Sequence, residues 1–95
     1  MDTNKNYIII TKLRAVAEKY ALSEEEQEIR RNQKIKDLEM RHFRAVAYNK
    51  AADAVSHHSV EIRSGKEAVT IKNIGPKISQ VIQKIITTGT TQLLD

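Results

Sequence analysis

The sequence predicts an all-α fold, a compact domain of four helices. Apolar residues recur at spacings of three and four, and no stretch shows the alternation of a half-buried strand. Two Ser-x-x-Glu sequences mark helix starts, and the 95 residues contain one proline and three glycines. A chain of this length is expected to form a single domain, spanning residues 1–95.

The first helix is predicted over residues 7–21. Its apolar stripe consists of Ile9, Leu13, Val16 and Tyr20. Residues at this spacing share one face of a helix, so this face should be buried against the rest of the domain.

A second, long helix is predicted over residues 24–56. Ser23 and Glu26 form a capping box at its start, and no helix-breaking residue follows until Ser56. The first half is nearly all polar, so we expect it to protrude, bend or fray. The second half carries a stripe that should pack: Leu38, His42, Ala45, Tyr48, Ala52 and Val55. In the polar half, Glu26 and Arg30 have the spacing of an ion pair.

Two shorter helices are predicted over residues 65–71 and 76–87. Ser64 and Glu67 provide a second capping box, and Pro76 suits the first position of a helix. Gly89 is a plausible left-handed stop.

The turn between these helices reads Asn73-Ile74-Gly75 and resembles the helix-hairpin-helix motif. Such a turn needs backbone that tolerates positive φ, which Gly and then Asn adopt most readily. Ile74 should fill the gap between the helices. The N–H groups of Asn73, Gly75 and Lys77 would then face outward at a helix N-terminus, where a phosphate can bind. The alternative is an ordinary helical turn with no ligand.

The surrounding sequence, from Phe43 to Leu94, resembles the amino-terminal domain of family X DNA polymerases, the polymerase β group. The resemblance rests on Phe-Arg-Ala-Val-Ala-Tyr-Asn-Lys-Ala-Ala-Asp-Ala-Val at 43–55, Ile-Arg-Ser-Gly-Lys-Glu-Ala at 62–68, the turn, and Thr88-Gly89. The same half is similar to the helix-hairpin-helix domain of XPF-type structure-selective nuclease subunits.

This resemblance implies a domain that binds the 5′ side of gapped DNA. It implies phosphate contacts by Asn73, Gly75 and Lys77, and a 5′-phosphate pocket built from Arg44, Tyr48 and Lys77. It also implies a monovalent cation, Na⁺ or K⁺, that bridges the carbonyls of Val69, Ile71 and Ile74 to a DNA phosphate. No other cofactor is expected.

The departures from the family bear on catalysis. The lysine with which lyase-active members form a Schiff base is replaced by Val81, which has no amine. Phe43 replaces the pocket histidine, and Val69 and Leu93 replace basic residues. We therefore expect no catalytic residue in this chain. Lys84, one turn beyond Val81, is the alternative nucleophile for a residual abasic-site lyase, and Lys77 is a second candidate for that role.

Composition supports a polyanionic partner. The net charge is +4, and residues 30–84 hold twelve Lys or Arg against five Asp or Glu. The basic run from Arg30 to Lys36 is either a DNA-tracking edge or a solvated face. The absence of cysteine excludes disulfides and thiol catalysis, and the three histidines have no metal-site spacing.

The sequence thus predicts an intracellular, non-sequence-specific DNA-binding domain acting in DNA repair on gapped, nicked or 5′-ended duplex, with a possible protein partner in a repair complex. No membrane segment is expected. The alternative is a helical protein-interaction domain whose polar segment, residues 24–36, docks a partner.

Overall fold

A computed structural model describes residues 6–94 of the chain, and these residues form helices and no strand. The elements are α1 (Tyr7–Tyr20), α2 (Glu24–Asn32), α3 (Lys36–Ser56), α4 (Gly65–Ala68), α5 (Pro76–Thr88) and the short 3-10 helix η1 (Gln92–Leu94). The all-α fold class is confirmed. No helix in this part of the chain combines the length and apolar character needed to cross a bilayer.

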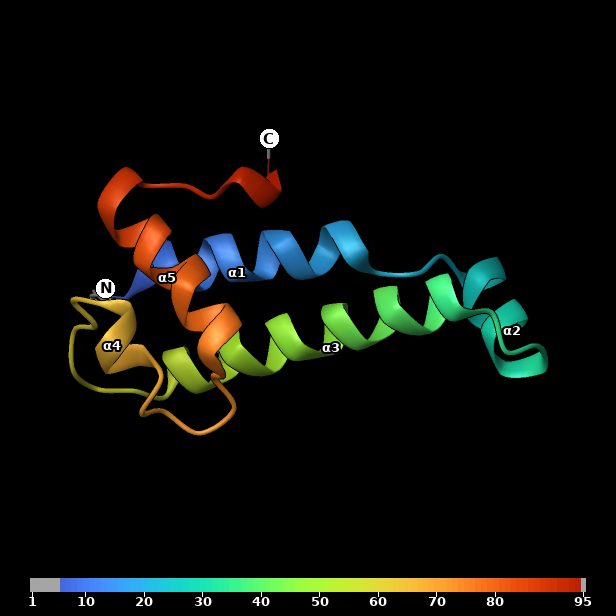
Figure 1. The fold of residues 1–95 in the computed structure, drawn as a ribbon, viewed down its shortest axis with the longest axis horizontal. Coiled ribbons are helices and arrows are strands. Elements are labelled where there is room, and N and C mark those ends of the chain that lie inside the picture. Colours follow the sequence, from blue (N-terminus) through green and yellow to red (C-terminus); the bar gives the residue numbers. More distant parts are fainter. Residues whose placement is uncertain (1–5, 95) are drawn as a thin grey trace.

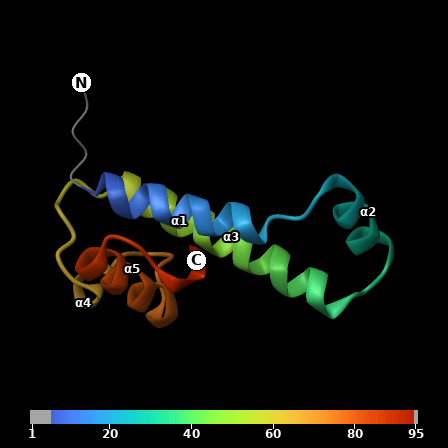
Figure 2. The same ribbon diagram turned by 90° about the horizontal axis from the view of Figure 1, so that it is seen from above.

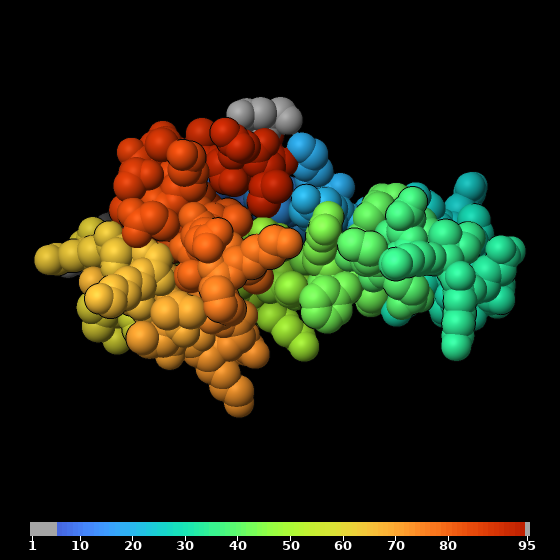
Figure 3. All heavy atoms as spheres, in the orientation of Figure 1, coloured from blue at the N-terminus to red at the C-terminus, as the bar shows by residue number. Residues whose placement is uncertain are grey.

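The helices make an elongated body of 42 × 29 × 26 Å. Helices α1 and α3 lie side by side along its length (Figures 1 and 2), with α4 and α5 at one end and α2 at the other. The space-filling view shows a broad end formed by the segments from α4 to η1, and a narrower end formed by α2 and the start of α3 (Figure 3). The two ends therefore expose separate surfaces.

The core lies between α1, α3 and α5. Leu13 and Val16 of α1 are fully buried, as are Ala51, Ala52 and Val55 of α3. The alanines allow the two helix backbones to approach closely, and Ile82 and Ile85 of α5 close the third side. Helix α1 starts at the predicted residue and ends one residue early.

A buried asparagine ties the start of α1 to the loop before α4. Asn6 is 2% exposed, and its side-chain amide donates to the Val60 carbonyl at 3.0 Å. Its side-chain oxygen accepts from the buried N–H of Ile62 at 2.8 Å. The second bond satisfies a backbone N–H that would otherwise be buried without a partner.

The prediction of one long helix over residues 24–56 is wrong, because the structure has two helices there. Residues 33–35 are not helical, and Gln33 has the extended angles φ −138° and ψ 147°. Helix α2 buries none of its residues, so no apolar face holds it in line with α3. Instead α2 folds back onto α3, and the Arg30 Nε–Glu39 Oε1 contact of 3.1 Å links the two helices. Leu38 and His42 are only half-buried, so the packed stripe of α3 begins at Ala45.

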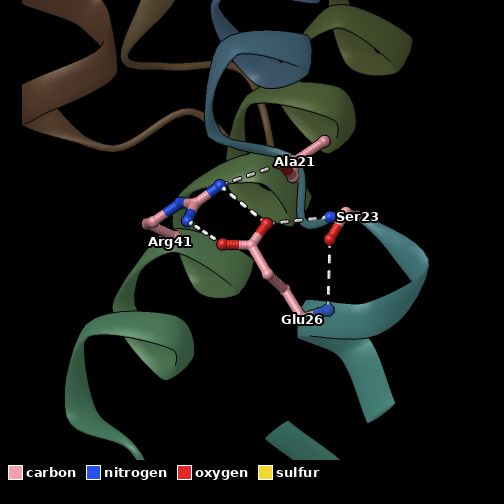
Figure 4. A network of polar contacts seen from close by, with 4 residues as sticks. All are labelled: Ala21, Ser23, Glu26 and Arg41. Atoms are coloured by element: carbon pink, nitrogen blue, oxygen red, sulfur yellow. Dashed lines mark hydrogen bonds and ion pairs between the residues drawn. The ribbon is translucent and has the colours of Figure 1, made fainter. Parts of the chain in front are cut away.

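A polar network anchors α2 where the chain leaves α1 (Figure 4). The predicted capping box is confirmed, since Ser23 Oγ accepts from the Glu26 N–H and Glu26 Oε1 accepts from the Ser23 N–H. Arg41 of α3 donates to Glu26 Oε2 at 2.6 Å and to the Ala21 carbonyl at 3.2 Å. The predicted pairing of Glu26 with Arg30 is wrong, because Arg41 reaches Glu26 across the fold-back.

The attachment of α2 should weaken in acid. The hydrogen bond from Arg41, followed by that from the Ser23 backbone, holds the pKa of Glu26 below its ordinary value of 4.5. A carboxyl group whose pKa is lower in the folded protein than in the unfolded chain stabilises the fold at pH values above its ordinary pKa. This contribution is lost as the pH falls through the folded-state pKa. We expect amide exchange in α2, followed by NMR, to accelerate relative to α5 below about pH 4.5. Glu26→Gln should remove this pH dependence and Glu25→Gln should retain it, whereas the same profile in both variants would contradict the assignment.

The helix predicted over residues 65–71 is also shorter than expected. Helix α4 ends at Ala68, after which Thr70 and Ile71 donate to carbonyls three residues back. This tighter winding leads directly into the turn. Ser64 caps α4 as predicted, but the Glu67 carboxylate accepts from the N–H of Arg63 rather than from that of Ser64. Helix α5 begins at Pro76 as predicted and ends at Thr88, where Gly89 adopts φ 83° as the left-handed stop.

Candidate nucleic-acid interface

The turn between α4 and α5 is built around one buried side chain. Ile74 is 4% exposed and joins the core, while Asn73 and Gly75 on either side are exposed. Asn73 has φ 75°, so it takes the left-handed conformation that the sequence suggests for this turn. Gly75 does not need positive φ, because its angles are φ −87° and ψ 179°. A Cβ atom at Gly75 would meet nothing within 4 Å, so the fold itself does not require glycine there.

The turn presents backbone donors at the N-terminus of α5. The N–H of Ile74 donates to the Ile71 carbonyl, and that of Ser79 to the Gly75 carbonyl. The N–H groups of Asn73, Gly75 and Lys77 have no acceptor among the described residues. The partial positive charge of the helix end adds to these donors. The turn therefore has the donors needed to hold a phosphate oxygen.

Close packing of α4 on α5 fixes the hairpin. Gly65 lies against α5 so tightly that a Cβ atom there would be 2.5 Å from the Ser79 backbone oxygen. The Gly65 N–H also donates to Gln83 Oε1 at 2.8 Å. Sequence reasoning missed this contact, because it treated Gly65 only as the first residue of a helix.

A groove of about 740 Å³ opens between the hairpin, α3 and the C-terminal segment. It brings Arg44 and Tyr48 together with Asn73, Gly75 and Lys77, so all five predicted DNA-binding residues line one surface. Four further residues singled out in the sequence also line it: Phe43, Val81, Lys84 and Leu93. The cations in its lining are Arg44, Lys77 and Lys84.

Two stacked tyrosines form one wall of the groove. The rings of Tyr20 and Tyr48 lie 6.4 Å apart between centroids, and the Arg44 guanidinium lies 5.5 Å from the Tyr20 ring centre. This cation–π contact holds Arg44 at the groove. Burial raises the pKa of Tyr48 above its ordinary value of 10. Tyr20, on α1, is a groove residue that sequence reasoning did not identify.

The residues expected to hold a cation lie on the α4 side of the turn, and none of them lines the groove. The Ile71 carbonyl already accepts from the Ile74 N–H, and a carbonyl oxygen has a second lone pair for a ligand. Three carbonyl oxygens, from Val69, Ile71 and Ile74, are a donor set suited to Na⁺ or K⁺. Among residues 6–94 no group of three His, Cys, Asp or Glu side chains is placed to bind a metal ion.

Comparison with known proteins gives two matches. A family model described as a helix-hairpin-helix domain matches residues 6–91. A stretch of 54 residues, 56% of the chain, is 41% identical to a protein named DNA polymerase IV from Saccharomyces cerevisiae. The match covers 9% of the length of that relative. No solved structure matches.

Proposed function

The chain belongs to the helix-hairpin-helix domain family, and on that basis we propose that it binds DNA through the backbone phosphates, without reading sequence. The observation that carries this proposal is the set of backbone N–H groups without acceptors at Asn73, Gly75 and Lys77. Contacts to phosphates position a protein on DNA and carry no sequence information directly. The similarity to a DNA polymerase supports the same function.

The preferred ligand in this proposal is duplex DNA with a gap, a nick or a free 5′ end, as arises in DNA repair. The groove beside the turn supports this choice, because it places Arg44, Lys77 and Lys84 around one hollow. A terminal phosphate carries more negative charge than an internal one and can enter a hollow that continuous duplex cannot. Phe43, which is 73% exposed, offers aromatic surface to a nucleotide there.

A monovalent cation completes the proposed contact. The carbonyl oxygens of Val69, Ile71 and Ile74 would hold Na⁺ or K⁺, and the cation would supply positive charge to a phosphate oxygen. None of these three residues lines the groove, so the cation and the groove would contact different phosphates of the DNA.

Catalysis by this chain is not part of the proposal. Val81 lines the groove, and the resemblance to family X polymerases aligns it with the nucleophilic lysine of lyase-active members; its side chain has no amine. Lys84 and Lys77 line the same groove and are exposed, so the lyase alternative would use one of these two amines.

The proposal is tested by fluorescence anisotropy with a gapped, 5′-phosphorylated duplex and with the intact duplex of the same sequence, at two salt concentrations. We expect binding to both, tighter binding to the gapped duplex, and a steep loss of affinity as salt rises. Equal affinity for the two duplexes would contradict the proposed preference for gapped or 5′-ended DNA. The absence of binding even at low salt would overturn DNA binding itself.

Gly75→Ala should weaken DNA binding while leaving the fold intact. The added methyl group has open space around it in the free protein, but it would stand beside the N–H groups that the phosphate approaches. Affinity for the gapped duplex should fall about tenfold, or about 1.4 kcal/mol. The free energy of unfolding should change by less than about 1 kcal/mol, because losing a polar N-cap side chain typically costs about 1 kcal/mol and Gly75 makes no side-chain cap hydrogen bond. Unchanged affinity would show that no phosphate comes close to Gly75.

A further inference from the structure

The groove beside the hairpin has charges of one sign only. Its charged side chains are Arg44, Lys77 and Lys84, and no carboxylate lines it among the residues that the structure describes. All three cations are exposed, and none of them takes part in an ion pair with another described residue. A hollow lined by one sign of charge attracts ligands of the opposite sign. Its volume of about 740 Å³ is that of a site for a small organic anion.

Apolar side chains lie beside these cations. On α5, Val81 lies one helical turn from Lys77 and one turn from Lys84, so the three residues share a face of that helix. On α3, Phe43 stands next to Arg44 and is 73% exposed, which is unusual for a large aromatic side chain. A sugar-phosphate without a base would leave this apolar surface in water, whereas a planar base would cover it. Three half-buried side chains complete the apolar lining: Ala47, Ile78 and Leu93.

Side-chain amides are the third component of the lining. Asn73, Gln80 and Gln92 are exposed and line the same groove. Each amide group offers both hydrogen-bond donors and an acceptor. The edge of a nucleobase carries donors and acceptors as well, so these amides can pair with it. Cations, an exposed aromatic ring and amides together match the phosphate, the face and the edge of one nucleotide.

We propose that the groove holds the unpaired 5′-terminal nucleotide of a DNA strand, with its phosphate at the cations and its base against Phe43 and Val81. This inference rests on the proposed DNA binding and extends it, because it assigns the base as well as the phosphate to the groove. A paired base must be unstacked and unpaired before it can enter, which costs free energy, whereas an unpaired base needs no such step. The protein should therefore prefer a gap whose downstream strand begins with an unpaired nucleotide.

Fluorescence anisotropy with three gapped duplexes tests the inference. They differ only in the 5′-phosphorylated residue at the edge of the gap and in the base opposite it: thymidine opposite adenine, thymidine opposite cytosine, and an abasic tetrahydrofuran opposite cytosine. We expect the unpaired thymidine to bind about tenfold more tightly than either of the others, which is within the range for stacking one base on an aromatic side chain. Removal of its 5′-phosphate should also weaken binding.

The outcomes separate this inference from DNA binding itself. Equal affinity for the unpaired thymidine and the abasic residue would overturn the inference and leave DNA binding intact. The absence of binding to all three duplexes at low salt would overturn both.

Phe43→Ala should lower the affinity for the unpaired thymidine about tenfold, to that of the abasic duplex, and leave the abasic affinity unchanged. The fold should be unaffected, because Phe43 is so exposed. The matched control is Val46→Ala, which shortens an exposed apolar side chain of α3 outside the groove lining and should keep the preference. A preference that survives Phe43→Ala, or is lost equally in both variants, would overturn the placement of the base.

NMR on the isotopically labelled wild type locates the base directly. The aromatic ring of a base shifts the signals of nuclei beside it. The methyl signals of Val81 and Leu93 should therefore shift more with the unpaired thymidine than with the abasic residue. Val69, which is 40% exposed and lies outside the groove lining, serves as the reference. Base-dependent shifts at Val69 and not at Val81 or Leu93 would contradict the proposed site.

Discussion

Gly65→Ala is expected to destabilise the domain by about 2–3 kcal/mol, in the upper part of the range of about 1–3 kcal/mol for forcing an extra carbon into a packed interior. The added Cβ atom would lie 2.5 Å from the Ser79 backbone oxygen, so α4 and α5 would have to move apart. The hydrogen bond from the Gly65 N–H to Gln83 would be strained by the same movement. For a domain of this size, the melting temperature measured by circular dichroism should fall by roughly 10–20 °C.

The sign of the stability change for Gly65→Ala distinguishes the effect of helix packing from the effect of helix propensity. Alanine is favoured over glycine in helices by up to about 1 kcal/mol, so propensity alone would make the substitution stabilising. Gly75→Ala is the matched control, because the same atom is added to the same hairpin in open space. A rise in melting temperature for Gly65→Ala would show that the two helices of the hairpin pack less closely than described.

Lys77→Glu is expected to lower the affinity for gapped duplex by about 30- to 100-fold, or about 2–2.7 kcal/mol. Lys77 lines the groove, and its backbone N–H is one of the three donors without an acceptor. The substitution removes a cation from the phosphate site and adds an anion. The slope of log affinity against log salt concentration should become shallower by about 0.9 for each phosphate that the variant no longer neutralises. Anisotropy titrations over a range of salt measure both quantities.

The control for Lys77→Glu is Lys50→Glu, the same change of charge at an exposed position of α3 outside the groove lining. It should weaken binding by only a small factor, through the general field of the protein, which salt screens. If the two variants lose affinity equally, binding follows net charge and the hairpin is not the contact site.

Much of the fold follows from local sequence. Helix α1 and helix α5 were predicted to within one residue at each end, because each combines an apolar stripe with a clear boundary. The positive φ of Asn73 and the burial of Ile74 follow from the same reasoning, since few residues suit those positions. The groove residues were predicted from the resemblance to a known family, and the structure places all five on one surface.

The remaining features depend on contacts between segments that lie far apart in the sequence. The break at residues 33–35 has no proline or glycine, and the fold-back is held by Arg30 to Glu39 and by Arg41 to Glu26. The i,i+4 spacing favoured an ion pair between Glu26 and Arg30, because a spacing argument considers only residues on the same helix. The role of Gly65 likewise depends on Ser79, which a linear sequence does not place beside it.

The tyrosine pair in the groove also gives the protein a built-in spectroscopic probe. The chain has no tryptophan and three tyrosines, of which Tyr20 and Tyr48 line the groove and Tyr7 is 67% exposed on α1. Fluorotyrosine incorporated throughout the chain would therefore give two ¹⁹F signals from the groove and a third from Tyr7, outside the groove lining, as an internal reference. Occupation of the groove could be followed in a mixture of protein and nucleic acid without attaching a dye to either.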